Sequence, residues 1–230
     1  MIEACPVLAI RRPVRRPTDA QIAAFADTPT SFIVDAMAGQ GALAAAIAPL
    51  STELPQAAHG PALTVNAGPG DCLATLAAPA FTRPGDMVLI GVAGHQGCAA
   101  LGDRVLGALR NAGAAGAVTD GPARDLDGIV TVGLPVWAAG LTPNSPMNTG
   151  PGEIGLPVQM GGRQVETGDM VIADRDGVVT VPFDLIDRVI GKLDTIRHLE
   201  GERDARVANG LIVTPDIEAL LASESVAWVD

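Results

Sequence analysis

Apolar segments that read as strands alternate with helix-like segments through the first half of the chain, and this alternation limits the possible folds more than any other feature. The expected strands are 61–66, 87–91 and 115–119. The expected helices between them are 72–81 and about 98–111. Glycine, proline or aspartate follows each segment, as at Asp120-Gly121, and these residues mark turns. Strands and helices in this order predict an α/β domain.

The segments before and after this unit have different patterns. Residues 1–17 are expected to form a loose arm, and two short helices then begin near Thr18 and Thr30. Further along the chain, turn signals at short spacing predict a portion of β-barrel or β-sandwich type. Its expected strands are 130–132, 135–138, 154–159, 170–174 and 178–181. A long charged helix is expected from 184 to about 209, with a final short helix after Thr214.

Length and composition fit a single domain. A chain of 230 residues can bury a core without disulfides. Its 48% hydrophobic and 18% charged residues exclude a disordered chain. We therefore expect one domain, made of the arm at 1–17, a core at 18–182 and a C-terminal helical extension at 183–230.

Charge and aromatic content exclude several kinds of partner. The chain has 26 acidic and 15 basic residues, and its formal net charge of −11 argues against nucleic-acid binding, which needs a basic surface. Aromatic residues make up 3%, so platforms that stack on bases or sugars are scarce. No apolar run approaches the roughly 20 residues of a membrane span, so no membrane partner is expected.

Cysteine use and the N-terminal pattern predict a cytoplasmic protein. Cys5, Cys72 and Cys98 are odd in number and widely spaced, which fits neither a disulfide framework nor a zinc site. The apolar residues 5–10 precede the basic segment 11–16, the reverse of the order in a secretory signal.

Lys192 is the single lysine among the 15 basic residues. An enzyme that forms a Schiff base needs a lysine in its site. Lys192 lies in the long charged helix, away from the polar clusters described next, so Schiff-base catalysis is not expected.

The densest polar cluster runs from Asp120 to Asp125, directly after the expected strand 115–119. Ligands of α/β folds bind at loops that follow the carboxyl ends of strands. Arg124 and Asp125 would face opposite sides of a regular strand, but from a turn both can face one pocket. Spacing alone favours the other interpretation, a turn that carries a surface ion pair.

A glycine-rich loop follows the expected strand 87–91. Gly91, Gly94 and Gly97 form GxxGxxG, which is not the GxGxxG of dinucleotide sites, and the loop has no P-loop lysine. His95 in this loop is interpreted as a solvent-facing residue, with a place in a pocket as the alternative. Cys98 is interpreted as a small helix residue, because no general base stands near it in the sequence.

Gly102 interrupts the helix expected from residue 98, since a glycine inside a helix costs about 1 kcal/mol. The alternative is a helix that begins near Gly102. The backbone amides of Asp103, Arg104 and Val105 then lie at a helix N-terminus, where they can hold a carboxylate. A broken helix with Asp103 and Arg104 exposed to solvent is the competing interpretation.

Short motifs of glycine, proline and aspartate turns joined to apolar strands continue in a fixed order from about Thr30 to Pro182. They are Gly60–Val65, Pro69–Asp71, Pro84–Leu89, Gly102-Asp103, Gly113–Asp125, Gly133–Ala138, Pro151-Gly152, Pro157-Val158, Gly161-Gly162, Gly168-Asp169, Ala173–Val179 and Val181-Pro182. In order and spacing this series resembles the RraA-like family, which includes the class II 4-hydroxy-4-methyl-2-oxoglutarate / 4-carboxy-4-hydroxy-2-oxoadipate aldolases.

The resemblance implies a fold, an assembly and a reaction. The fold is the swivelling β/β/α barrel-like domain of phosphohistidine-domain type, here with N-terminal helices and a long C-terminal helix. The assembly is a homotrimer, or two trimers paired into a hexamer, with sites at subunit interfaces. The reaction is retro-aldol cleavage of a 4-hydroxy-2-oxo acid to pyruvate and a second oxo acid, with oxaloacetate decarboxylation as a side activity.

The resemblance also implies a role for individual residues. Asp125 would be the direct ligand of Mg²⁺ or Mn²⁺, and Arg124 would bind the C2 oxygen and stabilise the enolate. Asp103 would hold the water that carries protons. The backbone amides after Gly102, those of residues 103–105, would bind the pyruvyl carboxylate. Glu200, from a neighbouring subunit, is the best-placed counterpart of a glutamate that assists this water in some members.

The chain departs from the family pattern around the distal half of the substrate. Cys72 and residues 74–77 replace an asparagine and a histidine that many members have, and 141–148 lacks a common basic residue. The segment 94–98 differs as well. These changes affect the expected choice of substrate more than the enolate chemistry.

A second class of function is a non-catalytic regulator that binds a ribonuclease. An acidic surface permits this role, whereas the retained Asp125 favours the enzyme, because regulator-type members tend to lack the metal ligand. The methyltransferase name sometimes attached to the family finds no GxGxG methyl-donor site in this chain.

Overall fold

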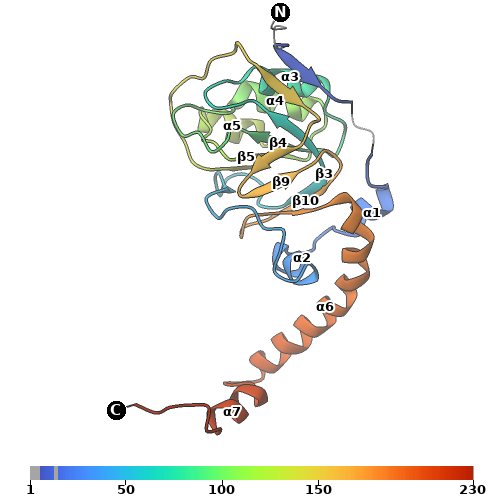
Figure 1. Cartoon of the computed structure of the whole chain (residues 1–230), viewed down its shortest axis with the longest axis vertical. Coiled ribbons are helices and arrows are strands. Elements are labelled where there is room, and N and C mark those ends of the chain that lie inside the picture. Colours follow the sequence, from blue (N-terminus) through green and yellow to red (C-terminus); the bar gives the residue numbers. More distant parts are fainter. Residues whose placement is uncertain (1–5, 13–14, 230) are drawn as a thin grey trace, which may run out of the picture.

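Four parallel strands form the middle of the main sheet (Figure 1). The computed structural model describes residues 6–12 and 15–229. In it, β3 (Ala58–Asn66), β4 (Met87–Gly91), β5 (Gly116–Thr119) and β6 (Val136–Ala138) pair side by side in that order. Because the strands are parallel, the loops that follow them leave from one edge of the sheet.

Further strands extend this sheet at both sides through antiparallel pairings, except that β1 pairs with β7 in parallel. Its other strands are β1 (Leu8–Ile10), β2 (Ala48–Pro49), β7 (Gly152–Ile154), β10 (Met170–Ala173) and β11 (Val178–Val181). The long strand β3 pairs with β10 through its first four residues and with β7 through its last two, Val65 and Asn66. A separate hairpin joins β8 (Val158–Met160) to β9 (Arg163–Val165).

Alternate residues of the central strands enter two different cores, as the period of two in a strand requires. Leu63 and Val88 belong to the core shared with α3 (Leu73–Ala77), η1 (Ala78–Ala80), α4 (Asp103–Asn111) and α5 (Leu126–Val132). Met87 and Leu89 face the other core, which the β8–β9 hairpin covers. Because α4 follows β4 and α5 follows β5 along the chain, the N-termini of both helices lie beside the edge where the parallel strands end.

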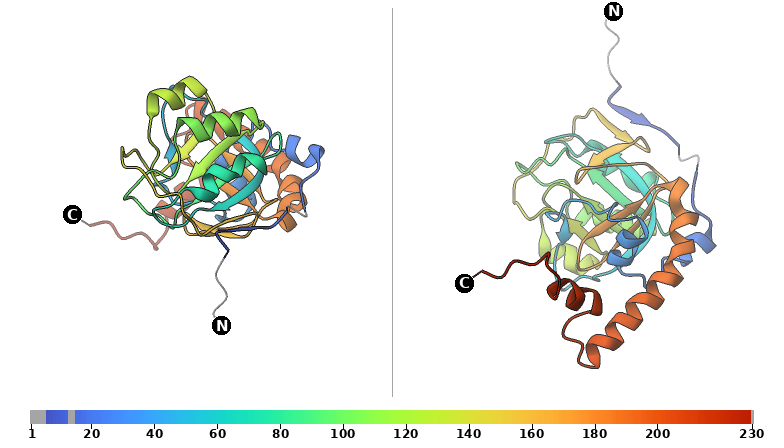
Figure 2. Two further views of the ribbon diagram at one scale, coloured as in Figure 1. Left: turned by 90° about the horizontal axis from the view of Figure 1, so that it is seen from above. Right: turned by 60° about the horizontal axis from the view of Figure 1, so that its bottom comes forward.

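The N-terminal helices and the C-terminal helix form a third packing group. The helices α1 (Asp19–Ala23) and α2 (Thr30–Ala36) pack with η2 (Phe183–Leu185) and the first half of α6 (Ile186–Ala208). The rest of α6 leaves the body, and the chain turns back at its far end into α7 (Pro215–Leu221) (Figures 1 and 2). None of the helices in the described part of the chain combines the length and apolar composition that crossing a membrane requires.

The structure confirms a mixed α/β fold with a long C-terminal helix and corrects several expected elements. Residues 130–132 belong to helix α5 rather than to a strand, because Gly133 ends a hydrogen-bonded turn with its N–H bonded to Ile129 O. The segment 154–159 contributes to two strands, β7 and β8. The helix expected from residue 98 begins at Asp103, as the alternative proposed.

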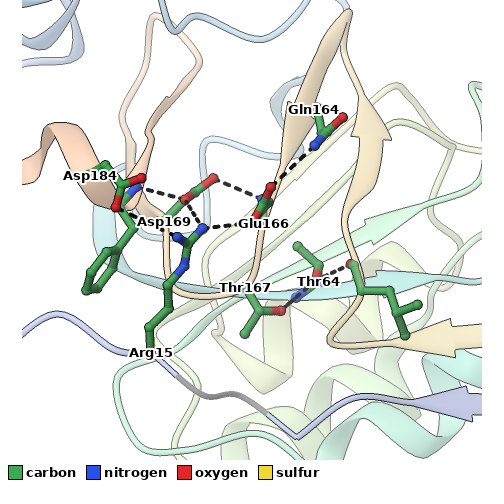
Figure 3. Close-up of polar contacts among 9 residues, drawn as sticks. Arg15, Thr64, Gln164, Glu166, Thr167, Asp169 and Asp184 are labelled. Carbon is green, nitrogen blue, oxygen red and sulfur yellow. Dashed lines mark hydrogen bonds and ion pairs between the residues drawn. The ribbon is translucent and has the colours of Figure 1, made fainter.

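The expected loose arm at 1–17 is wrong where the structure describes it. Residues 8–10 form β1, and Arg15 is fixed by an ion pair with Glu166 at 2.8 Å. The Arg15 guanidinium also lies 3.8 Å from Asp169 and stacks over the Phe183 ring at 5.1 Å (Figure 3). Residues 1–5 and 13–14 of the expected arm lie outside the described residues.

Candidate active site

Three loop segments meet beyond the ends of the parallel strands. Single β-bridges join Leu101 to Ala123 and Ala123 to Leu141. The Arg124 N–H donates to Leu101 O at 3.1 Å, and the Thr142 N–H donates to Ala123 O at 2.9 Å. These bonds place the polar cluster at 120–125 between the start of α4 and the loop 141–149.

Gly102 is the N-terminal cap of α4, in extended conformation with φ −150° and ψ −175°. Asp103 follows as the first helical residue, and its Oδ1 accepts the Arg104 N–H at 2.7 Å. Apart from this bond, the amides of the first turn have no backbone partner within their own helix, and the helix dipole favours negative charge there. The alternative interpretation of the sequence, a helix that begins near Gly102, is confirmed, and the Val105 side chain is buried in the core.

Asp125 caps α5 in the left-handed region, with φ 64° and ψ 49°. Its Oδ2 lies 3.4 Å from Arg124 Nε, and the two side chains are 52% and 37% exposed. A Cβ added to Gly102 would lie 3.1 Å from Asp125 Oδ2 and 3.3 Å from Arg124 Cγ. Arg124, Asp125 and the start of α4 therefore lie close together, and Arg124 and Asp125 form the partly exposed ion pair that the sequence spacing favoured.

Asp103 packs against the first turn of α5. A Cβ on Gly128 would lie 2.5 Å from Asp103 Oδ2 and 2.7 Å from Asp103 Cβ. Because residue 128 is a glycine without a side chain, the Asp103 side chain fits against α5 at this position. The two helices α4 and α5 consequently bring Asp103 close to the Arg124–Asp125 pair.

Ser145 is a site residue that the sequence did not reveal. The Arg124 guanidinium donates through Nη1 to Ser145 Oγ at 2.6 Å. The loop that carries Ser145 is held on both sides, since Ala99 N–H donates to Asn144 O and Asn144 Nδ2 donates to Gly97 O, each at 3.0 Å. This arrangement orients Arg124 toward the start of α4.

Asp71 fastens the far end of the same loop. Its Oδ2 accepts the Thr149 N–H at 2.8 Å and the Gly150 N–H at 3.0 Å, while Oδ1 accepts the Leu73 N–H at 2.7 Å. Burial raises the pKa of Asp71, but the hydrogen bonds from these backbone amides outweigh the effect of burial and hold the pKa below its ordinary value. The Pro69-Gly70-Asp71 turn was a signal for this role, because aspartate commonly binds backbone amides at turns.

The cysteines and His95 lie near the site without forming a nucleophile. Burial, followed by the charge of Asp71, raises the pKa of the Cys72 thiol against the opposing effect of Arg124, so the thiol stays protonated at neutral pH. Cys98 is in the loop before α4 and not in a helix, which corrects the interpretation of the sequence. His95 folds over its own loop, since a Cβ on Gly97 would lie 2.6 Å from His95 Nε2.

Glu200 and Lys192 lie elsewhere. Glu200 is on the part of α6 that projects from the body and pairs with Arg203, so a single chain does not bring it to Arg124 (Figure 1). The Lys192 Nζ donates to Ala36 O at 2.6 Å, on the α2–α6 side of the molecule.

The donor set at the site suits magnesium better than zinc. No group of three or more His, Cys, Asp or Glu side chains that could hold a metal ion occurs within residues 6–12 and 15–229. Mg²⁺ commonly takes one or two carboxylates and completes its shell with water and substrate oxygens. The half-exposed Asp125 carboxylate fits that kind of site, whereas structural zinc needs four protein ligands.

The fold and these convergent groups define an α/β protein with helix N-terminal amides, an arginine and carboxylates beyond the ends of its parallel strands. A family model described as "RraA-like: Aldolase/RraA" matches residues 30–180, and the chain belongs to this family. The chain is 37% identical over 191 residues to a protein of Halalkalibacterium halodurans named "Putative 4-hydroxy-4-methyl-2-oxoglutarate aldolase". That match covers 83% of this chain and 90% of the relative.

Two solved structures share the fold. An uncharacterized protein from Pseudomonas syringae pv. tomato matches with a TM-score of 0.75 at 23% identity, over 85% of this chain and 92% of that one. RraAS2 from Streptomyces coelicolor, described as an unusual member of the RNase ES inhibitor RraA protein family, matches with a TM-score of 0.70 at 25% identity. The second match covers 84% of this chain and 100% of that one.

Proposed function

We propose that this protein is a divalent-metal-dependent pyruvate aldolase with oxaloacetate decarboxylase side activity. Its substrate is a 4-hydroxy-2-oxo acid of the 4-hydroxy-4-methyl-2-oxoglutarate or 4-carboxy-4-hydroxy-2-oxoadipate type. The proposal includes the swivelling β/β/α barrel-like description of the fold and a cytoplasmic homotrimer or hexamer. The name of the Halalkalibacterium relative supports the reaction class.

The approach of Asp125 and Arg124 to the N-terminus of α4 carries the proposal. A 2-oxo acid presents a carboxylate and a neighbouring keto oxygen, both of which need positive or hydrogen-bonding groups. The amides of residues 103–105 are assigned to the carboxylate, although the Arg104 N–H, which donates to Asp103 Oδ1 at 2.7 Å, must change its partner to do so. Arg124 supplies a fixed cation for the keto oxygen.

Arg124 is assigned the stabilisation of the transition state. When the C3–C4 bond breaks, its electron pair passes into the C2 carbonyl and leaves an enolate. A guanidinium oriented by Ser145 is already in place for the negative charge that develops there. Such an interaction is stronger in the transition state than in the ground state and so raises the rate.

Asp125 is the residue that would hold Mg²⁺ or Mn²⁺. The ion, when bound, supplies Lewis-acid stabilisation of charge on the pyruvyl oxygens. Asp103 is assigned the proton steps, in which a water held by its carboxylate accepts the proton of the C4 hydroxyl and later returns a proton to C3. Pyruvate and the second oxo acid are then the products, and Glu200 of a neighbouring subunit is proposed to assist this water.

Pyruvate release from oxaloacetate and from 4-carboxy-4-hydroxy-2-oxoadipate, with Mg²⁺ and with a chelator, tests the proposal. Asp125→Asn should reduce the metal-dependent rate by about 100-fold or more, since it removes the charged ligand. Asp127→Asn, two residues further on the exposed face of α5, is the matched control and should keep the wild-type rate. No release from either substrate by the folded wild type, or full activity of Asp125→Asn, would contradict it.

The alternative is a regulator that binds a ribonuclease, and the likeness to Streptomyces RraAS2 favours it as the second candidate. A regulator needs no pyruvate-releasing activity. Inhibition of a ribonuclease E-type enzyme by both wild type and Asp125→Asn, without pyruvate release, would support this function instead.

A further inference from the structure

A cavity lies between α2, α6 and the strands β9 and β11. None of the residues that line it belongs to the candidate active site. Its volume is about 530 Å³. We call it the α2–α6 cavity. The lining residues used below are Met37, Arg163, Leu185, Arg188 and Lys192.

Three cationic side chains line the α2–α6 cavity. Lys192 Nζ donates to Ala36 O at 2.6 Å. Arg163 donates through Nε to Ala42 O at 3.2 Å and through Nη1 to Gln40 Oε1 at 3.1 Å. Arg188 makes no hydrogen bond or ion pair with the residues that the structure describes. The described lining includes no aspartate or glutamate. Each cation therefore retains N–H donors that no carboxylate of the cavity satisfies.

The charge of this cavity contrasts with that of the whole chain. The chain has 26 acidic and 15 basic residues. Three of the basic residues, including the single lysine, line this cavity, and no acidic residue does so among the described residues. Like charges repel one another, and an anion bound among them would relieve this repulsion. Beside the cations, Met37 and Leu185 offer apolar surface.

We propose that the α2–α6 cavity binds a small organic anion that carries a doubly charged group next to an apolar portion. Two or three charge-assisted hydrogen bonds from Arg163, Arg188 and Lys192 would hold the charged group. Met37 and Leu185 would contact the apolar portion. A volume of about 530 Å³ falls within the usual range of small-molecule sites.

Calorimetric titration of the full chain with phenyl phosphate tests this site. Phenyl phosphate combines a dianion with an apolar ring, and inorganic phosphate, which lacks the ring, should bind more weakly. Arg188→Gln should weaken phenyl phosphate binding roughly tenfold, as expected for one lost charge-assisted hydrogen bond. Arg206→Gln, an exposed change on the same helix α6, is the matched control and should bind like the wild type.

Substitutions at Lys192 and Arg124 distinguish binding in the α2–α6 cavity from binding at the candidate active site. Lys192→Met should abolish binding while Lys192→Arg retains part of it, with the melting temperature recorded for each. Arg124→Gln should leave this binding unchanged, because Arg124 does not line the cavity. Absence of saturable phenyl phosphate binding by the wild type, equal affinity in Arg188→Gln, or loss of binding only in Arg124→Gln would each overturn the proposal.

Discussion

A Cβ on Gly102 would lie 3.1 Å from Asp125 Oδ2, so the absence of a side chain at residue 102 allows the start of α4 to approach the carboxylate of Asp125. The same Cβ would lie 3.3 Å from Arg124 Cγ. Both distances are tighter than ordinary van der Waals contact. Gly102 has an extended backbone that any residue can adopt, so glycine is needed here for space and not for φ.

Gly102→Ala should therefore reduce activity more than stability. The new methyl group must displace Asp125 or Arg124 by a few tenths of an ångström, and small displacements of reacting groups lower rates strongly. We expect kcat/KM for pyruvate release to fall about 10- to 100-fold. Thermal unfolding monitored by circular dichroism checks that the fold is retained.

Gly107→Ala, in the interior of the same helix, is the matched control. Its Cβ would be 3.8 Å from Val132 Cγ2, an ordinary contact, and alanine is favoured over glycine inside a helix by about 0.5–1 kcal/mol. This variant should be slightly more stable and fully active. Equal activity of the two variants would contradict the role of Gly102.

Gly128→Ala should displace Asp103. The added Cβ would lie 2.5 Å from Asp103 Oδ2 and 2.7 Å from Asp103 Cβ, so α4 and α5 must move apart. We expect a loss of about 1–3 kcal/mol in unfolding free energy and a lower kcat. Gly191→Ala in α6, whose Cβ meets no atom of the described residues within 4 Å, should instead be neutral or stabilising when the two are compared by urea unfolding.

Ser145→Ala should loosen Arg124 without unfolding the loop. It removes the 2.6 Å bond from Arg124 Nη1 to Ser145 Oγ, while the backbone bonds of Asn144 and Met147 remain. We expect kcat to fall about 10-fold, the effect of losing one bond to a charged group. Steady-state kinetics that show a normal kcat would rule out Ser145 as a positioning residue, and Ser31→Ala on the exposed face of α2 serves as control.

Asp71→Asn should weaken the attachment of the loop 141–149 in a pH-dependent way. Hydrogen bonds from backbone amides hold the pKa of Asp71 in the folded protein below its value in the unfolded chain. The ionised carboxylate therefore contributes its full stabilisation of the fold at pH values above the unfolded pKa. This stabilisation disappears as the pH falls through the native pKa. At neutral pH we expect a loss of about 1–3 kcal/mol, because an asparagine NH₂ would face backbone N–H groups.

Unfolding free energies of wild type and Asp71→Asn, measured in urea from pH 7 downward, check this prediction. The two curves should converge as the solution becomes acidic. A difference that stays constant at all pH values would show that the charge of Asp71 is not what fastens the loop.

Arg15→Met should destabilise the attachment of the N-terminal segment by about 1 kcal/mol, because the pair with Glu166 is more than a third exposed and is screened by water (Figure 3). Burial already raises the pKa of Asp169, and the loss of Arg15 would raise it further. Protonation of Asp169 then favours the folded variant, so the defect should be largest at neutral pH and shrink as the pH falls through the native pKa. Denaturant titrations at pH 7 and at acidic pH measure the unfolding free energies of the wild type and Arg15→Met and check this prediction.

Local sequence patterns were sufficient to predict an element where neighbouring residues alone determine its conformation. The apolar run Met87–Gly91 is a strand with the predicted bounds, since five buried residues between turns leave few alternatives. Thr18 caps α1 with Gln21 in a reciprocal pair of bonds, and such a pair is a property of neighbouring residues. The β-branched segment 130–132 was misread because tertiary packing of α5 on α4 outweighs strand propensity.

By itself the sequence determined the order of strands and helices from residue 61 to residue 119, the family, and the polar residues Asp103, Arg124 and Asp125 as candidates. Only the tertiary structure decided that Gly102 faces Asp125, that Ser145 holds Arg124, and that Lys192 belongs to a separate cationic cavity. The physical reason is distance along the chain. Turns and strand runs depend on neighbouring residues, whereas these contacts join segments more than twenty residues apart that only the packed sheet and helices bring together.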